Sequence, residues 1–230
     1  MKRVIVAVAS PEYTPLLEVA QPSFVRFATQ YGYDLQLHTG LAAPPGRAHA
    51  WNKLPFLVTA LQDQGYDQVL LLDTDIVIVK FDRDFPWAEM GGADHALYVE
   101  DMPDGGVCPN TGVWGVTKKT LPLLYNIWAY PDRHDGEWAT KPCWEQSAYM
   151  ALQGYNASVI PHTAPAKFPS NLYDIGIDWN CPHVYTEKDP IIWHAGGMPD
   201  IEMRRQLMLK WSGRPYERML EKGIEWRIKN

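Results

Sequence analysis

The stretch Gln68-Val69-Leu70-Leu71-Leu72-Asp73-Thr74-Asp75 decides the fold class, because an apolar run ends abruptly on two acidic residues. Unbroken apolar runs of this length are typical of strands that are buried on both faces of a sheet. An apolar strand over 4–9, a helical pattern over 14–31, a short strand over 33–38 and a helix over 52–64 precede it. This alternation predicts a doubly wound α/β fold.

The remainder of the chain has a less regular pattern. Strands are expected over 95–99, 112–116 and 191–193, and helices over 119–130, over 143–152 and from about 200 onward. Residues 161–190 are rich in Pro, Asp and Asn, which predicts a long loop. Pro22 lies inside the first helical pattern, where it predicts a kink or a break. Without repeats or a flexible linker, we interpret residues 1–230 as one continuous domain.

The composition excludes several classes of protein. The 230 residues carry 21 basic and 27 acidic side chains, a net charge of −6, which argues against a general nucleic-acid binder. A hydrophobic fraction of 46% excludes a disordered chain. No apolar stretch reaches the roughly 18 residues of a membrane span. Three widely spaced cysteines form no disulfide framework and fit a reducing compartment, so we expect a cytoplasmic protein.

Positive charge gathers at the C-terminal end. Residues 201–230 hold eight basic and four acidic side chains, whereas the preceding 200 residues are net negative. The basic residues are Arg204, Arg205, Lys210, Arg214, Arg218, Lys222, Arg227 and Lys229. Two interpretations stay open: a solvated face of a terminal helix, or a patch that makes peripheral contact with an anionic membrane or binds an anionic acceptor.

Asp73 and Asp75 are the strongest chemical signal. Two carboxylates at i and i+2, directly after a buried strand, can converge on one divalent cation, and hard oxygen ligands suit Mg²⁺ or Mn²⁺. Two alternatives are a solvated turn and a haloacid-dehalogenase-like phosphatase with Asp73 as nucleophile. That phosphatase family carries its motif on the first strand and needs a later acidic pair, and this chain has neither feature.

Further motifs follow in a specific order. They are Val6-Ala7-Val8-Ala9-Ser10 with Tyr13, Tyr31-Gly32-Tyr33-Asp34, Trp51-Asn52-Lys53-Leu54-Pro55, Leu72-Asp73-Thr74-Asp75, Asn110-Thr111-Gly112-Val113-Trp114, Trp144-Glu145-Gln146-Ser147-Ala148 and Ile192-Trp193-His194-Ala195-Gly196-Gly197. In this order the chain resembles the GT-A-fold glycosyltransferases, especially the retaining galactosyl/xylosyltransferase and glycogenin-like groups. The resemblance implies a Rossmann-like GT-A domain with a central, mostly parallel sheet flanked by helices. Its nucleotide-binding half would span about 1–115 and its acceptor-side half about 116–230.

The resemblance also implies a role for each matching position. Asp73, Asp75 and His194 would bind Mn²⁺ (or Mg²⁺) together with the donor diphosphate. The positions implied for the donor and its nucleotide are Ala9, Ser10, Tyr13, Lys53, Thr74, Asn110, Thr111, Gly196 and Gly197. Lys53 would approach the ribose or the phosphates, and the two glycines would let the backbone approach the diphosphate closely.

Glu145 and Gln146 are the implied catalytic residues, at the start of a helix beneath the reacting sugar. They would hydrogen-bond the sugar or stabilise an oxocarbenium-like centre. Front-face reaction and a covalent intermediate on Glu145 both stay open. Relatives often carry a phosphate-gripping lysine after the His-x-x-Gly element. This chain has Met198-Pro199-Asp200 there, with Arg204 and Arg205 as the nearest basic residues, so the phosphate contact stays open.

The implied function is metal-dependent transfer of a hexose or pentose from a nucleotide-diphosphate sugar to a glycan hydroxyl. A UDP-sugar is the expected donor, a glycan or lipid-linked glycan is the expected acceptor, and the configuration would be retained. A non-catalytic glycan-binding protein is the alternative from another class. Five aromatic residues could line the acceptor side or simply pack a loop, and they are Phe168, Tyr173, Trp179, Tyr185 and Trp193.

Overall fold

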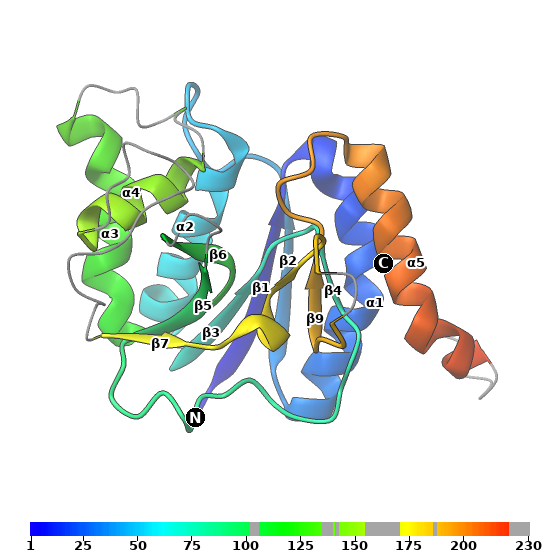
Figure 1. Ribbon diagram of the computed structural model, residues 1–230. Helices are drawn as coiled ribbons and strands as arrows, with labels where there is room; N and C mark the ends of the chain where they lie inside the picture. The colour runs from blue at the N-terminus through cyan, green and yellow to red at the C-terminus, as the bar shows by residue number, and fades with distance from the viewer. Residues whose placement is uncertain (102–105, 135–139, 141–142, 155–170, 186–187, 221–230) are drawn as a thin grey trace.

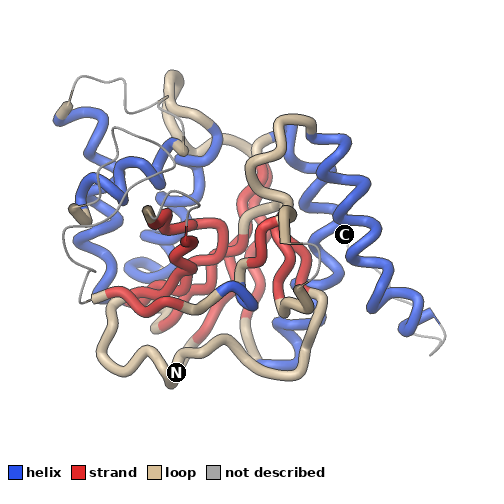
Figure 2. Tube along the Cα trace, in the orientation of Figure 1, coloured by secondary structure: helices blue, strands red, loops and turns tan. Residues whose placement is uncertain are grey.

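Figure 1 presents the computed structural model of the protein. It describes residues 1–101, 106–134, 140, 143–154, 171–185 and 188–220, with the backbone alone described over 213–220. A central sheet lies between two groups of helices (Figures 1 and 2). The α/β fold class predicted from the sequence is therefore confirmed.

The central sheet has six strands in the order β2-β1-β3-β6-β5-β7. Their bounds are β1 Arg3–Ala9, β2 Asp34–Thr39, β3 Gln68–Leu72, β5 His95–Asp101, β6 Val107–Thr117 and β7 Leu172–Asp174. β1 pairs in parallel with β2 and β3, and β5 pairs in parallel with β7. β6 runs antiparallel between β3 and β5. The sheet is mostly parallel, as the resemblance implied.

A small second sheet joins two distant parts of the chain. It has the order β4-β9-β8, with β4 at Ile76–Ile78, β8 at Cys181–Pro182 and β9 at Ile192–His194. β4 and β9 are antiparallel, and Ile76 lies opposite His194. β4 follows the Asp73–Asp75 turn directly, so this pairing brings the end of β9 to that turn.

The helices form one layer on each side of the sheet (Figure 1). α1 (Thr14–Tyr31) and α5 (Ile201–Leu220) pack against each other on one side, and α2 (Lys53–Val58), α3 (Leu121–Arg133) and α4 (Trp144–Leu152) lie on the other. Side chains of β1 and β3 alternate between the two cores. Ile5 and Leu70 face the α1 side, whereas Val4 and Val69 face the α2 side. Burial on both faces explains why these strands read as unbroken apolar runs.

α1 matches its predicted bounds and ends at Gly32, whose left-handed backbone (φ 71°) is the expected helix cap. The predicted break at Pro22 is wrong, because α1 continues through it. The next residue, Ser23, accepts a hydrogen bond from the Ile78 backbone N–H and so ties α1 to β4. The helix expected over 52–64 is instead a 3-10 turn over His49–Asn52, α2, and a π-helical turn over Thr59–Asp63.

Three predictions fall partly outside the described residues. The long loop predicted over 161–190 lies there in 161–170 and 186–187, and its described part contains the short strands β7 and β8. Phe168 of the aromatic set lies there, as do the side chains of Arg214, Arg218, Lys222, Arg227 and Lys229 in the basic C-terminal region. Among the helices that the structure describes, none is both long enough and apolar enough to span a membrane.

Candidate active site

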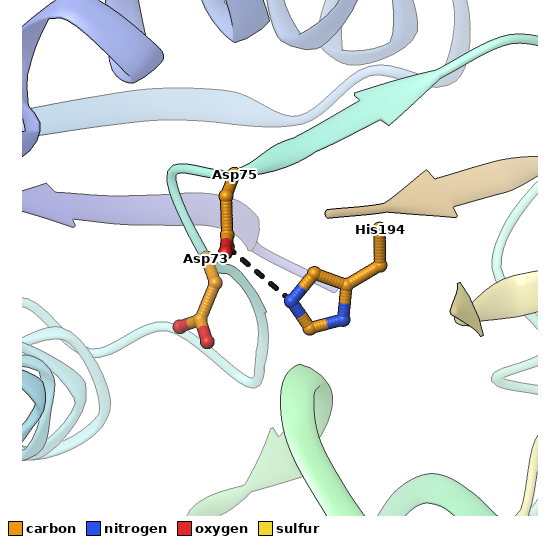
Figure 3. A group of neighbouring side chains, drawn as sticks. All are labelled: Asp73, Asp75 and His194. Carbon is orange, nitrogen blue, oxygen red and sulfur yellow. Dashed lines mark ion pairs between the residues drawn. The ribbon is translucent and has the colours of Figure 1, made fainter. Parts of the chain in front are cut away.

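Three side chains that suit a metal ion meet at the carboxyl edge of the central sheet. Asp73 and Asp75 lie in the turn between β3 and β4, and His194 ends β9 (Figure 3). One ligand atom from each lies within 4.8 Å of the other two. Octahedral Mg²⁺ has ligands at about 2.0–2.1 Å, so opposite ligand atoms stand roughly 4 Å apart. The three donors therefore fit one divalent cation with small adjustments.

Asp75 is held by two neighbours. Its Oδ1 lies 3.3 Å from His194 Nε2, and its Oδ2 accepts a hydrogen bond of 2.8 Å from Arg204 Nη1. Burial alone would raise the pKa of Asp75, but His194 and Arg204 lower that pKa to about 2. The carboxylate is therefore ionised at neutral pH.

Asn180 sets the orientation of the His194 ring. Its Oδ1 lies 2.8 Å from His194 Nδ1, while its Nδ2 donates to Asn110 Oδ1 at 3.0 Å. The amide oxygen of Asn180 then accepts a hydrogen bond from the His194 Nδ1–H, and Nε2 is the nitrogen that faces Asp75. Such outer hydrogen bonds fix the tautomer of a metal-binding histidine. Burial lowers the pKa of His194, but the Asp75 carboxylate outweighs it and raises the pKa overall.

Two glycines leave the space that the His194 ring occupies. A Cβ on Gly112 would lie 2.4 Å from His194 Cε1, and a Cβ on Gly196 would lie 2.7 Å from His194 Nε2. Both distances are well below an ordinary van der Waals contact. Close approach of the ring to two backbone segments explains why glycine stands at 112 and 196.

A second charged cluster lies beside the first. Lys53 Nζ is 2.7 Å from Glu145 Oε1 and 3.1 Å from Asp73 Oδ1, and Thr111 Oγ1 donates to the same Glu145 oxygen at 2.9 Å. Lys53 and Glu145 are 5% and 2% exposed. Burial alone would lower the pKa of Lys53, but Asp73 and Glu145 outweigh it and raise the pKa. Lys53 is thus a buried cation that links Asp73, and with it the candidate metal ligands, to Glu145.

Both clusters open into one pocket of about 510 Å³. Its wall includes Ser10, Asp73, Asn110, Glu145 and His194. The Oγ of Ser10 and the Oε2 of Glu145 are buried polar atoms that have no hydrogen-bond partner among the residues that the structure describes. Buried polar groups are normally paired, so a ligand in this pocket would supply the missing partners.

The fold of this chain is similar to the folds of known glycosyltransferases. No protein-family model and no curated protein sequence matches the chain. Solved structures do match. One is a glycosyltransferase involved in glycosylation of the major capsid of PBCV-1, with a TM-score of 0.65 at 19% identity, covering 90% of this chain and 98% of that one. A second is galactosyltransferase LgtC in complex with donor and acceptor sugar analogs, with a TM-score of 0.57 at 12% identity, covering 91% of this chain and 95% of that one. A third is mouse xyloside xylosyltransferase 1, with a TM-score of 0.51 at 12% identity, covering 86% of this chain and 98% of that one. The chain has the GT-A glycosyltransferase fold.

On this GT-A fold, the structure brings nearly all of the predicted site residues to one pocket. The lining includes Ser10, Tyr13, Lys53, Asp73, Thr74, Asp75, Asn110, Thr111, Glu145, Gln146, His194, Gly196 and Gly197. Ala9 is the exception. It is fully buried, and its carbonyl accepts a hydrogen bond from the Gly40 N–H. The structure therefore places Ala9 in the core behind Ser10.

Several residues in and around this GT-A pocket were not predicted from the sequence. Asn180 orients His194 from a segment predicted to be an irregular loop, and nothing in its local sequence distinguishes it. His49 and Trp144 lie together, with ring centroids 4.9 Å apart, and His49 also contacts Tyr13. Glu100, at the end of β5, adds a further half-buried carboxylate. A signal for Glu100 was present, since it ends an apolar strand as Asp73 does.

The backbone before α4 is unusual in the same pocket. Cys143 and Trp144 have φ angles of 64° and 45°, in the left-handed region that non-glycine residues rarely adopt. Both line the pocket, directly before Glu145. Backbone strain of this kind clusters at functional sites, where surrounding contacts hold it in place. Here it starts the helix that carries Glu145 and Gln146.

Proposed function

We propose that the protein is a metal-dependent glycosyltransferase. It transfers a sugar from a nucleotide-diphosphate sugar, with a UDP-sugar as the expected donor, to a hydroxyl of a glycan acceptor and retains the anomeric configuration. The observation that carries the proposal is the Asp73, Asp75 and His194 cluster in the pocket of a GT-A fold. The pocket volume also falls within the roughly 300–1,000 Å³ of typical small-molecule sites.

The proposed metal is Mn²⁺ or Mg²⁺. Carboxylate oxygens suit either ion, and a neutral imidazole suits Mn²⁺ well. When bound, the ion would supply a Lewis acid that neutralises the charge developing on the departing diphosphate. Asp73, Asp75 and His194 would hold the ion, and Asn180 keeps His194 Nε2 turned toward Asp75.

The unpartnered polar atoms support binding of a sugar nucleotide. We assign Ser10 Oγ to the nucleotide, because it lies buried beside Tyr13 at the end of β1. We assign Glu145 Oε2 to a hydroxyl of the donor sugar, because its partner oxygen Oε1 is already bound by Lys53 and Thr111. A buried acceptor oxygen that gains a donor recovers a free energy of about 1–3 kcal/mol.

Lys53 and Gln146 are positioning residues in this proposal. Lys53 forms ion pairs with both Glu145 and Asp73, while Gln146 Oε1 accepts a hydrogen bond of 3.1 Å from the Thr111 backbone N–H. These contacts fix both side chains before the donor arrives. With Glu145 Oε1 paired to Lys53, the carboxylate is a weaker nucleophile, which favours front-face reaction over a covalent intermediate on Glu145.

Thermal unfolding against a set of nucleotide-sugars, each with and without Mn²⁺, tests the proposal first. A ligand at about 100 times its Kd stabilises the fold by roughly 2.7 kcal/mol. We expect one UDP-sugar to raise the Tm only when Mn²⁺ is present. NMR of the product formed from that UDP-sugar should show that the transferred sugar retains the donor's anomeric configuration.

The metal role is tested by Asp75→Asn, which preserves shape and removes the charge. We expect transfer to be abolished while the far-UV circular dichroism spectrum stays unchanged. Asp189→Asn is the matched control, because Asp189 is an exposed partner of Lys80 outside the pocket. Undiminished transfer by Asp75→Asn would refute the metal role.

The thermal-unfolding experiment also distinguishes the alternative functions. Binding of glycan alone would indicate a non-catalytic binding protein, and stabilisation only by Mg²⁺ with a phosphoryl mimic would indicate a phosphatase.

A further inference from the structure

Arg204 connects the start of α5 to the candidate metal cluster. Its Nη1 donates to Asp75 Oδ2 at 2.8 Å, while its Nε and Nη2 both donate to the carbonyl of Met198. The guanidinium also lies over the ring of Tyr13, 5.9 Å from its centroid. Its side chain is 13% exposed and lines the pocket. Arg204 is therefore held rigidly with one edge toward the metal cluster.

The position of Arg204 affects the charge balance of the pocket. Among the described lining residues, the permanently cationic side chains are Lys53 and Arg204. Lys53 is enclosed between Asp73 and Glu145, so its charge is already matched. Arg204 has Asp75 as its carboxylate partner, and Asp75 is also a donor of the cation site. A divalent cation arriving alone meets an Asp75 that a guanidinium has already neutralised.

An anionic ligand would change this balance. A guanidinium carries five N–H donors, and the three contacts of Arg204 leave one further N–H on Nη1 and one on Nη2. Arginine presents such pairs in the geometry that a phosphate group accepts. A diphosphate beside the cation would then satisfy Arg204 and the cation at the same time.

We propose that Arg204 is a positioning residue that makes cation binding and diphosphate binding depend on each other. This inference rests on the proposed function in taking the ligand to be a nucleoside diphosphate. Arg204 weakens the capture of a bare cation through its charge, and it strengthens the capture of a cation that arrives with a diphosphate. Because linkage is reciprocal, one coupling factor describes both effects.

Isothermal titration calorimetry measures this factor directly. The Kd of Mn²⁺ is determined for the intact chain with and without saturating UDP, and again with pyrophosphate in place of UDP. The coupling factor is the Kd of Mn²⁺ without the anion divided by its Kd with the anion. We expect this factor to fall by about tenfold or more in Arg204→Gln, as loss of a charge-assisted contact predicts. Arg204→Lys keeps the charge and should keep part of the coupling.

Arg205→Gln is the matched control. Arg205 is the next residue of α5, is 38% exposed and pairs with Glu202 on the helix surface. We expect it to keep the wild-type coupling factor. Since Arg204 also anchors Met198, the far-UV spectrum and Tm of each variant are measured beside the titrations. A lower Tm with unchanged coupling would mean that Arg204 is only structural, which overturns the inference.

The two ligands separate this inference from the proposed function. If UDP binds with Mn²⁺ but Arg204→Gln keeps the coupling factor within twofold of wild type, the inference is wrong and the function stands. If pyrophosphate couples to Mn²⁺ through Arg204 while UDP and UDP-sugars do not bind, the proposed function is wrong, and the coupling by Arg204 holds for a diphosphate group but not for a nucleoside diphosphate. If neither anion changes the Kd of Mn²⁺ in the wild-type protein, both are wrong.

Discussion

Gly112→Ala is expected to disable the candidate metal site without a change of any ligand. Gly112 has an ordinary backbone φ, so alanine adds no torsional strain there, and the added Cβ is the whole perturbation. That Cβ would lie 2.4 Å from His194 Cε1, whereas an ordinary contact begins near 3.4 Å. The ring must therefore move by about 1 Å, unless the β6 backbone moves instead.

A movement of this size is large for a metal ligand. Coordination distances tolerate roughly ±0.2 Å, and the hydrogen bond from His194 Nδ1 to Asn180 Oδ1 is 2.8 Å long. Gly196 also lies close to the ring, since a Cβ there would be 2.7 Å from His194 Nε2, so the ring has little room to move. We expect Mn²⁺ affinity to fall by about 10–100-fold, the range seen when outer-shell support is lost. Overpacking should also lower the free energy of unfolding by about 1–3 kcal/mol.

Two other glycines separate these effects. Gly115→Ala, on the same strand, would place its Cβ 2.5 Å from Phe85 Cε1 outside the pocket, so it should destabilise the fold and leave Mn²⁺ binding unchanged. Gly92→Ala meets no described atom within 4 Å of its Cβ and should change neither the stability nor Mn²⁺ binding. Mn²⁺ binding is followed by calorimetry and stability by urea unfolding. Wild-type Mn²⁺ affinity in Gly112→Ala would refute the reasoning.

Two further predictions concern buried charge. Lys53→Met leaves Glu145 buried without its cation, so it should lower the free energy of unfolding by about 3–5 kcal/mol in urea titrations. Adding Glu145→Gln should restore part of that loss. A free energy of unfolding of Lys53→Met within about 1 kcal/mol of wild type would contradict this prediction. Burial lowers the pKa of His95 to about 4, so between pH 6.5 and 4 the unfolded chain binds a proton that the folded chain excludes. The free energy of unfolding should therefore fall by roughly 3 kcal/mol as the pH drops through that window. His95→Phe should flatten this pH slope by about one proton, and an unchanged slope would show that His95 is not its source.

The sequence predicted the parts of this fold that depend on local pattern. Strands such as β1 and β3 alternate their side chains between two cores, so the apolar run itself reports double burial. Gly32 marks the end of α1 because only a left-handed residue caps it there. Asp73 and Asp75 were found because acidic residues directly after a buried strand have few structural reasons to be there.

The missed features depend on contacts between distant segments. Asn180 reaches His194 through the pairing of β8 with β9, and Arg204 reaches Asp75 because α5 packs on α1 beside β4. Asn180 stands in no local pattern that differs from ordinary surface sequence. Arg204 was named with Arg205 as a basic residue near the His194 element, but its contact with Asp75 could not be predicted from that position. The placement of β4 in a separate sheet with β9 was likewise invisible, since three apolar residues give no indication of their pairing partner.

The ladder between β4 and β9 has a consequence for biosynthesis and turnover. Ile76 pairs with His194, and the Ala195 N–H donates to the Asp75 carbonyl, so the two parts of the candidate cation site come from segments far apart in the sequence. A nascent polypeptide that has emerged only as far as α4 carries both aspartates without their histidine. A cation that needs all three ligands could then bind only after β9 has been made and paired with β4. Once bound, the ion would raise the free energy of local opening at β9 and protect the strand from proteases.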